Sequence, residues 1–264
     1  MLEERQLNRP FMIMGLGGWA NAGDVSMMSV SYLVQKLQAR KLAELDGEYF
    51  YDMTVRRPFV DIEEGLLMNY APPRSDYYFV VREGKDNDIL FLLGHEPQLN
   101  WESYVNETIG LAQRSNAMMI FILGGLIDQV LHTASPMITG VVNMPRLKQD
   151  LIGRGVSLSN YKGPSSIHSL VLHEAKKREI PAISLWGHVP AYLAGPNPKV
   201  SHALLTKLVE MTGIEVDLEE IKKSSDALDL SLKDLTKGEL GFNEFMRLEK
   251  DRSEPEREGP EYLA

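Results

Sequence analysis

The chain has 264 residues, a formal net charge of −9, no cysteine, and 44% hydrophobic residues. The negative charge argues against a nucleic-acid binder, which needs clustered lysine and arginine to neutralise phosphates, and the lack of cysteine excludes disulfides, thiolate catalysis and cysteine-based zinc sites. A polar and charged start at residues 1–10 and the lack of an apolar run of about 18 residues predict neither a signal peptide nor a membrane span, so the cytoplasm is the expected location.

Apolar runs that end in glycine or proline turns alternate with helical patterns from residue 11 onward. Residues 11–14 predict a first strand, and the apolar spacing after its glycine-rich turn predicts a helix with Asp24 as its N-cap. Residues 48–55 and 76–81 alternate as strands do, while the arginine and proline clusters between them indicate a loop. Residues 88–93 and 117–123 are continuous apolar runs typical of buried parallel strands, and a helix at 101–115 joins them.

The same alternation continues to residue 213. Val141 and Val142 belong to a further strand or a short helix. Ser165 and Ser166 are interpreted as the N-cap of an amphipathic helix that ends near residue 177, and residues 180–187 predict a short strand. A helix from about 199 to 211 closes the domain. The pattern as a whole predicts an α/β sandwich over residues 1–213, a class of fold that places ligands at the carboxyl ends of its strands.

Residues 214–252 differ from the domain before them. A heptad seam runs through this segment and is formed by Leu218, Ile221, Ser225, Leu228, Leu232 and Leu235. Glycines break the seam before a second apolar stripe at 242–248, which predicts a helical hairpin. The hairpin either packs back on its own domain or forms a subunit or partner interface. We expect Leu228 and Leu232 to be buried, because an exposed seam would leave a contiguous apolar stripe. Residues 253–264, with four glutamates, predict a disordered acidic tail.

The loops after the predicted strands hold polar and aromatic side chains that are candidates for a small-ligand site. These residues are Trp19, Asn21, Asp24, His95, Glu96, Asp128 and His132. The pair at 95–96 follows one central strand and the pair formed by Asp128 and His132 follows the next, so the two pairs could meet at the carboxyl edge of the sheet as an acid/base pair. The alternative is that these histidines and carboxylates cap helices and turns.

The segment from Gly15 to Ala20 formally fits the G-x-G-x-x-G/A pattern of dinucleotide-binding turns. In that pattern the helix begins within the glycine run, whereas here the helical periodicity begins only after Asp24. A structural turn or a different ligand loop therefore stays open beside the nucleotide interpretation, and no cofactor is predicted. The six histidines lack the spacings that place two imidazoles on one helix face, so no metal is predicted.

Six short motifs stand along the chain in a recognisable order. They are residues 18–24, Arg57 with Pro58, residues 94–97 with Trp101, and residues 132–136, 163–165 and 186–193. Together they resemble the proteasome assembly chaperone 2 family, in particular its bacterial branch with a helical C-terminal extension. The resemblance implies a three-layer α/β/α sandwich similar to phosphorylase and hydrolase-like folds. It also implies a homo-oligomer, with a trimer expected first and a dimer next.

A protein partner is a further implication of this resemblance, because eukaryotic and archaeal members of the family assist proteasome assembly. Some of them use a C-terminal tripeptide made of a hydrophobic residue, a tyrosine and any residue. This chain departs from that tripeptide, since Tyr262 is third from the end and follows Glu261.

Two functions from different classes are therefore expected. The first is a non-enzymatic assembly or interaction protein that binds neither nucleic acid nor membrane. The alternative is a small-molecule-binding enzyme, of a hydrolase or nucleoside-processing type, with its site at the carboxyl ends of the central strands. Convergence of the candidate side chains in one enclosed pocket would favour the enzyme, and their separation would favour the interaction protein.

Overall fold

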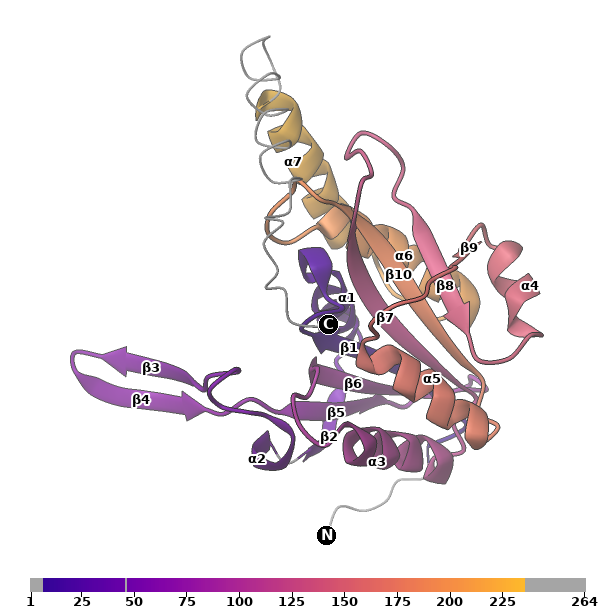
Figure 1. The fold of residues 1–264 in the computed structure, drawn as a ribbon, viewed down its shortest axis with the longest axis horizontal. Coiled ribbons are helices and arrows are strands. Elements are labelled where there is room, and N and C mark those ends of the chain that lie inside the picture. The colour runs from indigo at the N-terminus through magenta and orange to yellow at the C-terminus, as the bar shows by residue number, and fades with distance from the viewer. Residues whose placement is uncertain (1–6, 46, 236–264) are drawn as a thin grey trace, which may run out of the picture.

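An eight-stranded mixed sheet forms the centre of the protein (Figure 1). The computed structural model describes residues 7–45 and 47–235. The strands lie in the order β2-β5-β6-β1-β7-β10-β8-β9. Their bounds are β1 (Phe11–Gly17), β2 (Arg40–Leu45), β5 (Ser75–Val80), β6 (Ile89–His95), β7 (Met119–Asp128), β8 (Ile138–Val142), β9 (Ser157–Leu158) and β10 (Ala182–Pro190). The central strands β6, β1, β7 and β10 pair in parallel, and β5 and β8 flank them in antiparallel pairing.

Helices cover both faces of this sheet, which confirms the predicted three-layer α/β/α sandwich (Figure 1). One face packs against α1 (Val25–Lys36), α4 (Leu147–Ile152) and α6 (Pro198–Thr212), and the other against α3 (Trp101–Arg114) and α5 (Ile167–Lys177). Successive residues of a strand point to opposite faces, so Phe11 and Ile13 join the first core while Met12 and Met14 join the second. Burial on both faces explains why these strands are continuous apolar runs.

The structure corrects several predicted elements. Residues 48–55, predicted to be a strand, begin instead within the short helix α2 (Gly47–Phe50) and continue as turns. The edge strand β2 was not predicted, because three of its six residues are exposed and charged and its apolar residues do not alternate with polar ones. The strand predicted to end at residue 123 continues to Asp128 in β7, and Val141 and Val142 lie in the strand β8.

Residues 59–71, predicted to be a loop, form an antiparallel hairpin of β3 (Phe59–Glu63) and β4 (Leu66–Ala71). Its turn consists of Glu64 and Gly65, whose φ values of 47° and 82° give the left-handed backbone of a tight hairpin turn. Figure 1 shows the hairpin projecting from the sandwich at one end of the molecule. We call residues 59–71 the arm.

The first helix of the predicted C-terminal hairpin is α7 (Glu219–Leu235). Ile221 and Leu232 are buried, and Leu228 is half-buried. Leu228 and Leu232 lie beside Val200 of α6. This part of the seam therefore packs back on its own domain. The second helix and the acidic tail fall outside the described residues, and the domain boundary at residue 213 stays a prediction.

Candidate functional site

The glycine-rich loop after β1 is held by Asn21. Its side-chain Oδ1 accepts hydrogen bonds from the backbone N–H groups of Ser26 at 2.8 Å and Met27 at 3.1 Å, and its Nδ2 donates to Asp24 Oδ1 at 2.8 Å. Asp24 stands at the N-cap position with a left-handed φ of 54°, but its side chain accepts no bond from the helix. The prediction that Asp24 caps α1 is therefore wrong, because the side chain that caps this helix belongs to Asn21, three residues upstream.

Replacing Asn21 with alanine should lower the free energy of unfolding by about 1 kcal/mol, because two N–H groups of the first helical turn lose their acceptor. The matched control is Asp24→Asn, which removes the carboxylate charge but keeps a side-chain oxygen for Asn21 Nδ2 and a residue type that tolerates the left-handed φ of 54°, and its effect should stay within about 0.5 kcal/mol. Urea unfolding of both variants at one protein concentration checks this. Equal losses for the two variants would contradict the assignment of the cap to Asn21.

His95 ends β6 beside this loop and faces the side chain of Arg56. A guanidinium only donates, so the short contact between Arg56 Nη2 and His95 Nε2 makes the imidazole the acceptor and therefore neutral. Burial, with the nearby charge of Arg56, lowers the pKa of His95 to about 4. Gly17 is required here, because a Cβ at this position would lie 2.7 Å from the imidazole ring. Arg56, which the sequence analysis did not single out, is therefore part of the site.

An open cavity of about 490 Å³ lies over these residues. It is lined by Gly17, Gly18, Asn21, Asp24, Met27, Met28, Ser31, Tyr32, Gln35, Arg56 and His95. Three of the predicted ligand-binding residues, Asn21, Asp24 and His95, thus come together. Trp19 is 65% exposed on the same loop and does not line the cavity. A ligand-binding role for these residues stays a prediction.

Glu96 has a structural role that its position in the sequence could not reveal. Its Oε1 accepts a hydrogen bond of 2.8 Å from the backbone N–H of Ile167, the first residue of α5. Ser166 accepts a further bond from the N–H of His168, which confirms the predicted N-cap of this helix. The alternative in which loop carboxylates cap helices is therefore the one that the structure supports for Glu96.

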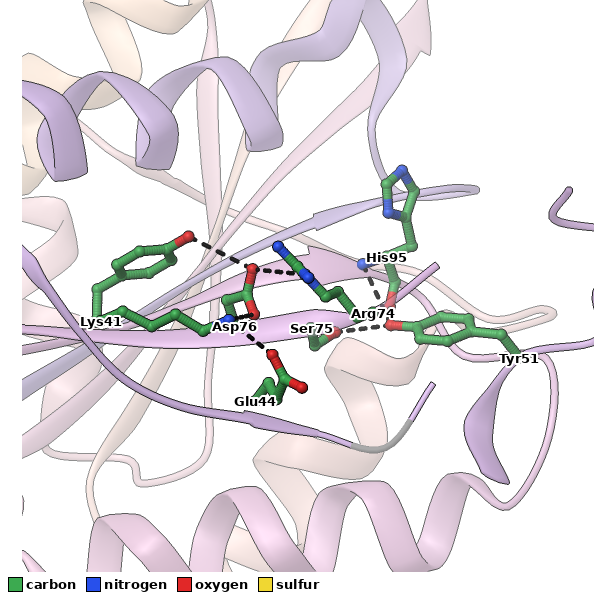
Figure 2. A network of polar contacts seen from close by, with 8 residues as sticks. Lys41, Glu44, Tyr51, Arg74, Ser75, Asp76 and His95 are labelled. Carbon is green, nitrogen blue, oxygen red and sulfur yellow. Dashed lines mark hydrogen bonds and ion pairs between the residues drawn. The ribbon is translucent and has the colours of Figure 1, made fainter. Parts of the chain in front are cut away.

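A network of hydroxyl and charged groups lies behind His95 (Figure 2). Tyr51 Oη donates to the His95 carbonyl at 2.8 Å and lies 2.6 Å from Ser75 Oγ, which lies 2.8 Å from Tyr104 Oη. Burial raises the pKa of Tyr51 and of Tyr104, so both phenols are neutral hydrogen-bonding groups at neutral pH. The end of β6 is thereby fixed to β5 and α3.

Asp128 and His132 do not form the predicted pair. Asp128 Oδ2 lies 2.7 Å from His188 Nδ1, and His188 Nε2 lies 2.9 Å from Thr139 Oγ1. The hydrogen bond from His188 lowers the pKa of Asp128. His132 turns instead to Tyr192, with 2.8 Å between Nδ1 and Oη. The reason is strand register, since β7 and β10 pair in parallel as far as Asp128 and Pro190 and so bring Asp128 close to His188, while His132 lies in the loop beyond β7.

The chain from Asp128 through His188 to Thr139 has the order of a catalytic triad, yet its surroundings argue against catalysis. The adjoining cavity has a volume of about 20 Å³, which is room for about one water molecule. Both His188 and Thr139 are buried. The chain therefore serves to tie β7, β10 and β8 together.

The candidate residues thus divide into two groups. His95 lines the open cavity, and His132 lines the small one. Because the two pairs do not converge in one enclosed pocket, the geometry does not favour the enzyme alternative. In the part of the chain that the structure describes, no group of three histidine, aspartate or glutamate side chains is placed to hold a metal ion. No helix in the same part is long and apolar enough to span a membrane.

Comparison with known proteins places this fold and its loops in a family. The PAC2 family model matches residues 15–236. A PAC2 family protein of Streptomyces avermitilis is 28% identical, with 89% of this chain and 99% of that chain covered and a TM-score of 0.80. A proteasome-assembly chaperone homologue of Mycobacterium tuberculosis is 25% identical, with the same coverage and the same TM-score. An uncharacterized protein of Methanocaldococcus jannaschii is 23% identical over 97% of this chain and 93% of its own length. The chain belongs to the PAC2 family.

Proposed function

We propose that the protein is a cytoplasmic, non-enzymatic assembly protein that forms a homo-oligomer and binds protein through the arm. The observation that carries this proposal is an apolar face of the arm that its own domain leaves uncovered. Membership of the PAC2 family supports the same class of function, because one relative is a proteasome-assembly chaperone homologue. A trimer is the expected oligomer, and a dimer is the next.

Strand register places four apolar side chains on one face of the arm. Val60 lies opposite Tyr70, and Ile62 lies opposite Leu67. Cross-strand partners share a face, and alternation along β3 puts Val60 and Ile62 on the same side. All four side chains are between 45% and 61% exposed. They form a continuous apolar strip, which we call the apolar face of the arm.

The opposite face of the arm is polar only at its centre, where Asp61 lies opposite Asn69, while Phe59 and Leu66 toward its two ends are 68% and 65% exposed. A contiguous exposed apolar strip is unfavourable in water, and an isolated two-stranded hairpin is only marginally stable without a covering surface. Covering about half of each large apolar side chain would contribute roughly 1 kcal/mol per side chain. The arm therefore has the composition of a segment that lies against another protein surface.

The base of the arm is fixed to the sandwich. Arg74, just beyond β4, forms an ion pair with Asp76 at 3.2 Å, and Lys41 of β2 approaches the same carboxylate at 2.9 Å (Figure 2). Before the arm, Arg56 contacts His95. Both chain segments that enter and leave the arm are thus tied to the sheet, so the arm is presented in one direction from a fixed base.

Two lysines on the apolar face should dissociate the oligomer. In the variant Ile62→Lys/Leu67→Lys, two charges would have to be buried against the covering surface, and light scattering at micromolar concentration should give the mass of one chain, 29.8 kDa. The wild type should give two or three times that mass. The matched control, Asn69→Lys/Ala71→Lys, adds the same two positive charges on the opposite face and should keep more of the oligomer. A wild type that is a monomer, or an unchanged mass in the apolar-face variant, would refute the proposal.

A further inference from the structure

The arm is strongly acidic as well as apolar. Residues 59–71 contain Asp61, Glu63 and Glu64 and no lysine or arginine, which gives a net charge of −3. Within the described residues, these three carboxylates form no ion pair, as all the ion pairs there join other groups. A surface that covers the arm should therefore combine apolar side chains with positive charge.

Such a surface exists at the far end of the same molecule. Residues 145–158, which comprise α4, β9 and the segments beside α4, carry three basic residues and one acidic residue, so their net charge is 3 − 1 = +2. The basic residues are Arg146, Lys148 and Arg154, and none of them pairs with a carboxylate among the described residues. We call residues 145–158 the basic end.

The basic end also exposes an apolar side chain. Ile152 of α4 is 51% exposed, while the neighbouring Leu147 and Leu151 of α4 are buried in the core. In addition, β9 is the last strand of the sheet, so one side of its backbone has no neighbouring strand. The basic end therefore offers both properties that the arm requires, apolar contact and positive charge.

The two surfaces lie at opposite ends of the long axis. Figure 1 shows the arm at one end and α4 with β9 at the other. Surfaces so placed on a single chain do not meet within it, but the arm of one copy can meet the basic end of the next. Such a head-to-tail contact is heterologous, and it closes into a ring when the rotation between copies allows. This geometry agrees with a trimer better than with a two-fold dimer.

A contact between two arms is the main alternative, and the charges disfavour it. An arm-to-arm contact would place a net charge of −3 against another net charge of −3. The three arginines near the base of the arm offset this little, because two of them already have partners: Arg56 contacts His95, and Arg74 pairs with Asp76. Like charges facing each other across an interface cost free energy, whereas the contact between arm and basic end joins a net charge of −3 with one of +2.

We infer that the apolar face of the arm is covered by the basic end of a second copy of this chain, so that copies join head to tail in a closed ring. This inference rests on the proposed function and names the surface that the arm binds. Because exposed charges are screened by salt, the oligomer should also weaken as ionic strength rises.

Paired charge reversals test the inference in the full chain. We expect Glu63→Lys/Glu64→Lys at the tip of the arm, and separately Arg146→Glu/Lys148→Glu at the basic end, to reduce the mass in light scattering toward 29.8 kDa. Combining all four substitutions in one chain should restore the oligomer, because opposite charges face each other again. The control Lys222→Glu/Lys223→Glu makes the same charge change at exposed positions of α7 and should leave the mass unaltered.

Three outcomes would overturn the inference. The first is an oligomer that survives reversal of the basic end although the Ile62→Lys/Leu67→Lys variant dissociates; the proposed function would then stand, with another surface covering the arm. The second is a four-fold variant that stays at the mass of one chain while circular dichroism shows it folded. The third is a wild-type protein that is a monomer, which would remove both the inference and the proposed function.

Discussion

Replacing Gly94 with alanine is expected to lower the free energy of unfolding by about 3 kcal/mol, although only one methyl group is added. A Cβ at this position of β6 would lie 1.9 Å from Ser75 Oγ and 2.7 Å from Ser75 Cα. The second of these atoms is backbone, so no rotation of a side chain relieves the clash. Strand β5 would have to move, and with it the Ser75 hydroxyl that bonds Tyr51 and the buried Tyr104.

The matched control is Gly110→Ala in the middle of α3, where the same methyl group meets only the end of the flexible Arg114 side chain at 3.3 Å. Alanine favours the helix over glycine, so this variant should gain about 0.5 to 1 kcal/mol. Urea unfolding at a fixed protein concentration measures both, since the stability of an oligomer depends on concentration. Two midpoints that shift in the same direction would contradict the packing argument.

The central sandwich could be predicted from the sequence because each of its signals is local. Strands such as β1 and β6 are buried on both faces, so their apolar runs are continuous and are bounded by glycine turns. The helix that starts at Val25 follows from its apolar spacing alone, and Ser166 caps its helix within two residues. Local patterns of this kind do not depend on distant parts of the chain.

The arm escaped prediction because burial on one face, the usual cause of alternation along a strand, is missing in it. Its strands are not buried by their own domain, and Met68, which the register shift leaves without a partner on β3, breaks the alternation along β4. Pro58 and Pro72, which flank the arm, indicate a loop. The signal that could have found it is the Glu64-Gly65 pair between two apolar runs, since a glycine at the second position suits a two-residue hairpin turn.

The sequence placed candidate residues at the correct edge of the sheet but could not pair them. Asp128 bonds His188, which is 60 residues away, and Glu96 bonds the N–H of a residue 71 positions away. Which side chains meet is decided by strand register and by the entry angles of the loops, and neither is a local property. Arg56 was missed for the same reason, because it reaches His95 from a segment that the sequence assigned to a strand followed by a loop.

The largest effect of solution conditions is expected on acidification, through His168 of α5. This imidazole is buried, its Nδ1 lies 2.9 Å from Ser184 Oγ, and its ring packs 4.6 Å from that of Trp186. Burial lowers the pKa of His168 to about 3, and no charged group contributes to the shift. The folded protein therefore keeps this side chain neutral at a pH where an exposed histidine is protonated.

The direction of the effect follows from the two pKa values. In the unfolded chain a histidine titrates near 6.5, so between about pH 6.5 and 3 the unfolded state binds a proton that the folded state does not. The contribution of the neutral His168 to the free energy of unfolding is fully present above about pH 6.5 and is lost as the pH falls through this window. At pH 4 the loss from His168 should be about 3 kcal/mol, because each unit of difference in pKa corresponds to about 1.4 kcal/mol. His95, with a pKa of about 4, acts in the same direction.

Urea unfolding of wild type and His168→Gln between pH 7 and pH 4 isolates this contribution. Glutamine retains a polar group that can bond the Ser184 hydroxyl but takes up no proton, so the variant should lose stability at pH 7 and should fall less steeply as the pH decreases. The matched control is His173→Gln, an exposed histidine on the same helix, which should keep the wild-type slope. Carboxylates also titrate near pH 4, but they are common to all three proteins and cancel in the comparison. If wild type and His168→Gln fall in parallel across the window, the buried imidazole is not the source of the acid sensitivity.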